Sequence, residues 1–161
     1  MNTTIREAAS SDIDALAELD ASVNPDPWPA GRFRRLIAGS AGQLHAGVLA
    51  LSYRDRLCGF SAYQIVVDEG TLLNIGVERR YRRRGLARRL LQASLQAMRD
   101  HGARHCFLEV RCSNTAALAL YRAEGFALDG VREGYYRRFS DPAQAGREDA
   151  LLMSLPLEAL S

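Results

Sequence analysis

The chain has 161 residues, 47% of them hydrophobic and 25% charged, and its formal net charge is +2. These values are typical of a soluble domain of ordinary size, and they exclude a disordered or collagen-like chain. No apolar run approaches the roughly 18 residues that a membrane-spanning helix needs. The first residues also lack the basic-then-apolar pattern of a secretory signal. We therefore expect one domain, residues 1–161, that works in the cytoplasm and contacts no membrane.

The basic residues are informative by type and by position. A net charge of +2 does not by itself indicate nucleic-acid binding. All 21 basic residues are arginine, which a GC-rich genome explains. Such a bias does not explain why seven of them fall within eleven positions: Arg79, Arg80, Arg82, Arg83, Arg84, Arg88 and Arg89.

Cysteine and histidine give no disulfide or metal pattern. The three cysteines are an odd number at wide spacing, and no pair has C-x-x-C spacing. Gly102 is expected to end a helix between His101 and His105, so these histidines would not share a helical face. We expect no metal site.

The first quarter of the chain predicts two helices around a proline-rich loop. A helix is expected to start at Ser11, with apolar residues at helical spacing that Asp20 interrupts. Residues 24–29 contain three prolines and predict an ordered loop in which Trp28 packs on other groups. Pro29 suits the first turn of a short second helix.

A β-rich stretch follows. Residues 44–53, 57–67 and 71–77 predict three strands separated by turns, which together form an antiparallel meander. The third strand is apolar on both sides except at Asn74, which predicts a central position in the sheet.

The rest of the chain alternates helices and strands. Leucines at helical spacing predict a helix over residues 84–101. The remaining elements are a strand over 105–110, a helix from Ser113 or Asn114 to Glu124, and strands over 126–132 and 149–155 joined by a long polar loop. The helix between the third and fourth strands indicates a parallel crossover. The predicted fold class is therefore α/β, with a mixed, mostly antiparallel sheet flanked by helices.

The clustered arginines lie in a turn between a strand and a helix, Arg82-Arg83-Arg84-Gly85-Leu86-Ala87. Small residues at such a turn expose backbone N–H groups, and the helix N-terminus adds positive potential, a combination that binds phosphate. Nearby arginines can reach further phosphate groups. The alternative is a solvated turn before an arginine-rich surface helix. The glycine pattern fits neither a Walker loop nor a Rossmann fingerprint.

Two further segments carry candidate functional residues. Glu109 is a carboxylate inside an apolar strand, which costs free energy unless it is paired or functional. An outward orientation or an ion pair with Arg111 would also explain it. Asn114, Tyr121 and the Gly-Phe pair that follows could be a helix cap, a core residue and a helix stop. Their joint spacing, however, is hard to produce by chance.

Together these patterns resemble a known family. The turn R-x-x-G-x-A at residues 82–87 and the pattern N-x-x-A-x-x-L-Y-x-x-x-G-F at residues 114–126 resemble the GNAT superfamily of N-acetyltransferases. Further segments are similar to the bacterial ribosomal-protein-alanine N-acetyltransferases: L-N-I-G-V at 73–77, L-E-V-R at 108–111, G-R-E-D-A at 146–150, Pro27-Trp28 and Tyr135-Tyr136. The resemblance covers nearly the whole chain and implies the acyl-CoA N-acyltransferase fold, with one splayed parallel strand pair.

The resemblance also implies the role of each site residue. Glu109 matches the general base of the family and Tyr121 its general acid, and no metal takes part. Trp28, Tyr135 and Tyr136 match positions that contact the acceptor. The residues implied to bind acetyl-coenzyme A are Ile75, Gly76 and Val77 for the pantetheine arm, Arg83, Arg84, Gly85, Leu86, Ala87 and Arg88 for the pyrophosphate, and Asn114.

The chemistry of acetyl transfer agrees with these roles. Attack on a thioester requires a neutral amine, so a carboxylate can accept the proton directly or through water. The departing thiolate, whose free pKa is about 8.5, gains from a proton or hydrogen bond that a phenol supplies. Neutralising an α-amine near pH 7 costs about 3.4 kcal/mol less than neutralising lysine, because their pKa values differ by roughly 2.5 units. This difference favours an N-terminal amine and does not identify the peptide. The resemblance implies direct transfer to a protein N-terminus, that of a small-subunit ribosomal protein beginning with alanine.

Some positions depart from the pattern of these enzymes. Glu78-Arg79 replaces Asp-Pro or a similar pair, Gly134 and Arg137 flank the two tyrosines in place of Asn and Pro, and residues 138–145 form a longer loop. A small amine, such as a polyamine or an antibiotic, is therefore the alternative acceptor. An arginine-rich module that binds RNA or the ribosome is the alternative outside the superfamily, although no direct contact with nucleic acid is expected. The oligomeric state stays open, with a monomer favoured.

Overall fold

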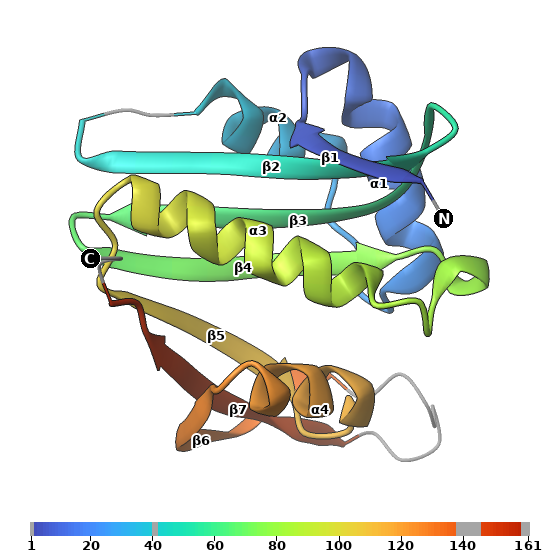
Figure 1. Ribbon diagram of the computed structural model, residues 1–161. Coiled ribbons are helices and arrows are strands. Elements are labelled where there is room, and N and C mark those ends of the chain that lie inside the picture. Colours follow the sequence, from blue (N-terminus) through green and yellow to red (C-terminus); the bar gives the residue numbers. More distant parts are fainter. Residues whose placement is uncertain (1, 40–41, 138–145, 159–161) are drawn as a thin grey trace.

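A computed structural model describes residues 2–39, 42–137 and 146–158 of the chain (Figure 1). Within these residues, strands form one mixed sheet in the order β1-β2-β3-β4-β5-β7-β6. The strands are β1 Thr3–Glu7, β2 Leu44–Tyr53, β3 Arg56–Val66, β4 Glu69–Val77, β5 His105–Arg111, β6 Ala127–Arg137 and β7 Arg147–Pro156. The helices are α1 Ile13–Val23, α2 Ala30–Ala38, α3 Leu86–Asp100 and α4 Thr115–Ala123, with short 3₁₀ turns η1 Ser10–Asp12 and η2 Arg79–Tyr81.

The central topology agrees with the sequence. Strands β2, β3 and β4 form the expected antiparallel meander, and β4 and β5 are the expected parallel pair. The fold class, a mixed and mostly antiparallel sheet flanked by helices, is confirmed.

Strand β1 has no counterpart in the predicted order of elements. It pairs with the edge of β2 and carries a single aliphatic side chain, that of Ile5, so its sequence gives little hydrophobic signal. The last two strands are also longer than predicted. Strand β6 runs on to Arg137 and β7 begins at Arg147, so the connection between them is shorter than the expected polar loop. The loop at residues 138–145 lies outside the described residues.

The helices cover both faces of the sheet (Figure 1). Helices α3 and α4 cover one face, where leucines such as Leu90, Leu91 and Leu118 share a core with β2 to β5 and β7. Helices α1 and α2 cover the other face, where Leu16 and Phe33 pack on β2 and β3. The sheet therefore separates two sides of the molecule, which we call the α3–α4 side and the α1–α2 side.

The parallel strands β4 and β5 diverge along their length (Figure 1). Their pairing joins residues 69–71 to residues 105–107 and ends there. Just beyond this point Ala62 of β3 pairs with Asn74 whereas Tyr63 pairs with Leu72, so Leu73 is the extra residue of a β-bulge. A bulge bends its strand and increases the local twist. The bend in β4 thus coincides with the start of the gap between the two strands.

Candidate active site

Among the described residues, the edge of β4 that faces β5 is paired with that strand only up to Thr71. Glu78 donates its N–H to the Cys58 carbonyl of β3. Because backbone groups alternate in direction along a strand, the N–H and C=O groups of Ile75 and Val77 point away from β3, toward the gap. The Val77 carbonyl accepts a hydrogen bond from Arg82 Nε at 3.2 Å, which agrees with this direction. The edge therefore offers backbone groups to an extended, amide-containing ligand.

Gly76 brings β4 close to the α1–α2 side. A Cβ atom at this position would lie 3.0 Å from the Phe60 ring and 3.0 Å from Val23 Cγ2. Both neighbours are core groups that leave no space for a side chain. Glycine is therefore required by packing at the same point where the strand edge is exposed.

The arginine-rich turn leads directly into α3. Gly85 precedes the helix with φ +73°, and Arg83 also has a positive φ of +63°. The first helical hydrogen bond runs from Arg89 N–H to the Gly85 carbonyl, so the N–H groups of residues 86–88 lie ahead of the α-helical ladder. A helix start of this kind favours an anion through its N–H groups and its dipole.

Several of the clustered arginines have partners within the protein. The Arg88 side chain pairs with Glu124 at the end of α4, at 2.5 Å, and Arg89 donates to Thr3 of β1. Arg80 pairs with Glu78 at 2.7 Å. These side chains therefore fix the turn to neighbouring elements, and the backbone of the turn remains the feature suited to phosphate.

Asn114 directly precedes α4 and Tyr121 lies on it, on the α3–α4 side. Asn114 caps the helix, because its side chain accepts the N–H of Ala117 at 3.2 Å. Tyr121 is 5% exposed and packs with Phe126 at a ring distance of 5.7 Å. Burial raises the pKa of the Tyr121 phenol well above its ordinary value, and the nearby Cys106 and Tyr136 groups add to the rise. The hydroxyl is thus protonated at neutral pH and can act as a donor.

Glu109 lies on β5 beyond the last residue paired with β4. Its neighbours Leu108 and Val110 point into the core shared with α4. Because side chains alternate along a strand, Glu109 points to the α1–α2 side. Its carboxylate forms an ion pair with Arg132 of β6 at 3.2 Å. Glu109 therefore has a cationic partner from a strand that the sequence did not indicate.

The two tyrosines of β6 adjoin Glu109. Arg132 lies over the Tyr135 ring at 4.7 Å, and Arg111 lies over the Tyr136 ring at 4.4 Å. Burial raises the pKa of Tyr136 to about 12, and the Glu109 carboxylate contributes to this rise. Glu109, Tyr136 and the two arginines form one cluster, which we call the β5–β6 cluster.

Acidic residues of β7 hold this region in place. Residues 133–135 of β6 bulge out opposite Asp149, and Asp149 accepts the N–H of Gly134 at 2.9 Å. Gly134 has φ +59°, a conformation that favours glycine. The buried Glu148 accepts the Ser113 hydroxyl at 2.7 Å, just before α4. The G-R-E-D-A segment therefore supports both the tyrosine pair and the start of α4.

Trp28 lies in the loop between α1 and α2. Its ring packs on Phe33 at 5.3 Å, and the Arg32 guanidinium covers it at 4.0 Å. Its backbone N–H donates to Asp20, a fully buried residue of α1. In the sequence, Asp20 appears only as an interruption of an apolar stripe, and its partners could not be inferred.

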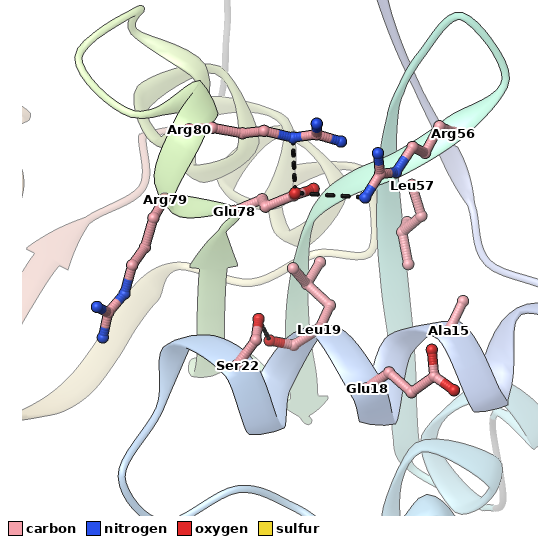
Figure 2. Close-up of a pocket in the computed structure, with 9 residues that line it drawn as sticks. All are labelled: Ala15, Glu18, Leu19, Ser22, Arg56, Leu57, Glu78, Arg79 and Arg80. Atoms are coloured by element: carbon pink, nitrogen blue, oxygen red, sulfur yellow. Dashed lines mark hydrogen bonds and ion pairs between the residues drawn. The ribbon is translucent and has the colours of Figure 1, made fainter.

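A separate pocket of about 550 Å³ lies between α1 and the turn after β4 (Figure 2). In it the Glu78 carboxylate lies between Arg80 and Arg56, at 2.7 and 3.4 Å. Glu78 thus fixes the end of β4 to the start of β3. The pocket has no lining residue in the gap between β4 and β5.

Across the gap, the candidate proton-accepting and proton-donating groups occupy opposite sides of the sheet. Tyr121 and the helix start at Gly85 belong to the α3–α4 side, and Glu109 and the β5–β6 cluster belong to the α1–α2 side. A ligand passing between β4 and β5 would reach both. This arrangement suits a reaction with two substrates that arrive from opposite faces.

The described residues carry few other candidate sites. Cys58 and Cys106 are buried and Cys112 is exposed, all as free thiols. In the part of the chain that the structure describes, no three His, Cys, Asp or Glu side chains converge as a metal site would require. The helices found there are all too short or too polar to span a bilayer.

Comparisons with known proteins agree on one family. Residues 13–126 match the model of the acetyltransferase (GNAT) family. The [ribosomal protein bS18]-alanine N-acetyltransferase of Salmonella typhimurium is 36% identical over 154 residues, which cover 96% of this chain and 97% of that protein.

Solved structures give the same result. The crystal structure of the ribosomal-protein-S18-alanine N-acetyltransferase from Escherichia coli superposes with a TM-score of 0.85 and 31% identity, over 99% of this chain and 97% of that one. Arabidopsis thaliana NAA60 in complex with acetyl-CoA shares the fold, with a TM-score of 0.80 at 20% identity over 97% and 99% of the two chains. The chain is an acetyltransferase and belongs to the GNAT family.

Proposed function

We propose that this enzyme transfers the acetyl group of acetyl-CoA to the N-terminal α-amine of a protein, that of a small-subunit ribosomal protein beginning with alanine. The observation that carries the proposal is the divergence of β4 and β5, with a helix start suited to phosphate on one side and Glu109 on the other. We choose this acceptor because the relatives are named as alanine N-acetyltransferases of ribosomal protein S18. We place the reaction in the cytoplasm, where ribosomal proteins are made.

On the α3–α4 side, the residues fit the donor. The outward backbone groups of Ile75 and Val77 suit the amides of a pantetheine arm. The N–H groups of residues 86–88, with Gly85 leaving room beside them, suit a pyrophosphate. The side chains of Arg83 and Arg84, which are exposed, can add charge, and Asn114 lies at the neighbouring start of α4.

On the α1–α2 side, Glu109 accepts a proton from the acceptor amine, directly or through a water molecule. The neutral nitrogen attacks the thioester carbonyl carbon, and the C–S bond breaks as the amide bond forms. Trp28 and the tyrosine pair Tyr135-Tyr136 supply aromatic surface around the incoming N-terminus. Arg132 neutralises the Glu109 carboxylate until a cationic acceptor takes its place.

On the opposite side, Tyr121 donates to the departing sulfur. The thiol of the product has a free pKa of about 8.5, and the raised pKa of Tyr121 keeps the phenol protonated in the resting enzyme. The hydroxyl thus supplies a hydrogen bond, and then a proton, to the thiolate, and the phenolate takes a proton back from solvent as Glu109 releases its own. The proton lost by the amine and the proton gained by the sulfur pass through different groups.

The test is a transfer assay with matched acceptors, read by mass spectrometry. One acceptor is a peptide that begins with the free alanine of the bS18 protein from the same genome. A second has the same sequence with a blocked N-terminus and an internal lysine, and a third is spermidine. We expect acetylation of the free N-terminus alone. Acetylation of spermidine in place of the peptide would move the enzyme to the small-amine class. Acetylation of lysine would remove the α-amine assignment.

A further inference from the structure

The α1–α2 side contains a buried carboxyl group that the proposed reaction does not use. Asp20 is 0% exposed, although it belongs to the helix α1 that covers the sheet. Burying a carboxyl group costs several kcal/mol unless donors surround it. Each of its hydrogen bonds comes from an N–H group. These donors show which parts of the molecule the carboxyl group joins.

The donors come from two other segments. Oδ2 accepts the backbone N–H of Trp28 at 2.8 Å. The side-chain amide of Asn74, on β4, lies 3.2 Å from Oδ1 and 3.3 Å from Oδ2. Asn24 closes the network, because its amide donates both to Asp20 and to Asn74 Oδ1, the latter at 3.2 Å. One carboxyl group thus fastens the loop of residues 24–29 to β4.

The point of attachment on β4 is next to the proposed donor site. Asn74 directly follows the bulge at Leu73 and directly precedes Ile75, whose backbone faces the gap. The loop carries Trp28, which lies among the proposed acceptor contacts. The network therefore spans the distance between the strand that would hold the donor and the loop that would contact the acceptor.

We propose that Asp20 is a positioning residue for the acceptor, which holds the loop of residues 24–29 at a fixed place relative to the donor strand through Trp28 and Asn74. This inference rests on the proposed function and adds to it. Asp20 touches neither substrate. It acts by setting where the acceptor loop lies before a peptide arrives, so that binding does not have to order the loop.

The test compares Asp20→Asn with Asp14→Asn, an exposed residue of the same helix. Asparagine keeps the shape of Asp20 but replaces one acceptor oxygen with a donor that opposes Asn74 or Trp28. We expect KM for the alanine peptide to rise about tenfold or more, with the dissociation constant for acetyl-CoA within about twofold of wild type. Asp14→Asn should leave both constants unchanged. Asp20→Glu, which restores the carboxylate, should recover part of the peptide affinity.

A second readout does not depend on activity. Trp28 is the only tryptophan of the chain, so tryptophan emission, excited selectively over that of the six tyrosines, reports on the loop. We expect the emission of Asp20→Asn to shift to longer wavelength, as a half-buried indole becomes more exposed to water. Asn24→Ala, which removes the outer donor and leaves the other contacts of Asp20, should give a smaller shift and a smaller rise in KM. The Asn24→Ala variant still tests the proposal if Asp20→Asn does not fold.

The outcomes separate this inference from the proposed function. Wild-type enzyme that acetylates no peptide would overturn the proposed function, while the fluorescence shift would still report on the loop. A folded Asp20→Asn variant with wild-type peptide KM and unchanged emission would overturn the positioning role. Equal losses of peptide and acetyl-CoA affinity together with a lower melting temperature would reduce Asp20 to a structural residue.

Discussion

At Glu109, one carboxylate is both the partner of Arg132 and the group that we propose to accept a proton. Both partners of the ion pair are partly exposed, so the pair contributes about 0–1 kcal/mol to stability. The two roles can therefore be separated by measurement, because loss of the ion pair barely affects folding whereas loss of a proton acceptor affects turnover.

We predict that Glu109→Gln lowers kcat by roughly 10²–10⁴-fold, the usual effect of removing a positioned acid or base. Its melting temperature and its affinity for acetyl-CoA should stay close to wild type. The residue lies on the side of the sheet opposite the turn of residues 82–87, where we propose that the pyrophosphate binds. Glu69→Gln is the control, because Glu69 is exposed at the paired end of β4 and should keep full activity. Full turnover in folded Glu109→Gln would remove the catalytic assignment.

Tyr121→Phe keeps the buried ring and removes only the hydroxyl, so the fold should survive and the loss should appear in kcat. The direction of its pKa shift gives a second expectation. Since the folded protein raises the pKa of this phenol above its ordinary value of about 10, Tyr121 stays protonated as the pH rises to that value. Wild-type kcat should then show no alkaline decline below about pH 10 from this group. A decline near pH 8 that Tyr121→Phe abolishes would contradict the raised pKa, and full turnover in folded Tyr121→Phe would remove the acid assignment.

Two residues show how far single positions can be interpreted from sequence. Asp20 interrupts an apolar helix stripe, and Asn74 interrupts an apolar strand. Each is an exception within its own element, and the structure shows that the two exceptions bond to each other. The rule that buried polar groups need partners could have linked them. The choice of partner could not be predicted, because it depends on how α1 crosses the sheet.

At the level of elements, Gly85 just before α3 has a counterpart in Gly102, which follows the end of the same helix. Gly85 and Gly102 both have positive φ, +73° and +84°, and a Cβ atom at either would meet nothing within 4 Å. A substitution at either site thus carries similar backbone strain, about 1–2 kcal/mol. Only Gly85 adjoins the proposed phosphate site.

We predict that Gly85→Glu weakens acetyl-CoA binding by about tenfold or more, because a carboxylate and a side chain then occupy the space beside the N–H groups of residues 86–88. Gly102→Glu should lose comparable stability and keep its affinity. Isothermal titration with acetyl-CoA on both variants checks this. Equal affinities would show that the turn is an ordinary solvated one.

The elements differ in how well the sequence predicts them. Helix α3 and the strands β2 to β5 carry long apolar patterns, and their predicted bounds lie close to the observed ones. Strand β1 and the outer half of β6 do not, because they form against a partner edge and expose most of their side chains. The β-bulge at Leu73 could not be predicted from the sequence either, because an extra residue inside a strand that is apolar on both faces leaves the hydrophobic pattern unchanged.

At the scale of the whole molecule, the fold joins two half-sites that no single element contains. Local patterns identified the turn before α3, Glu109 and Tyr121 as candidates. Their placement on opposite sides of one sheet follows from the topology, in which β4 and β5 are parallel neighbours that separate after residues 71 and 107. In the proposed site, this divergence would let one molecule of donor contact both sides, so its binding should stabilise the sheet as a unit.

We therefore predict that acetyl-CoA raises the melting temperature of the enzyme. At a concentration about 100 times its dissociation constant, a ligand that binds only the folded state adds about 2.7 kcal/mol. For a domain of this size that corresponds to roughly 5–11 °C. Gly102→Glu should show the same increase from its own lower melting temperature. Gly85→Glu should show about half of it or less at the same concentration, because a tenfold weaker affinity leaves about 1.4 kcal/mol. Because the increase depends on binding and not on turnover, Glu109→Gln should retain it in full. A wild-type melting curve unmoved by saturating acetyl-CoA would mean that the gap does not bind the donor.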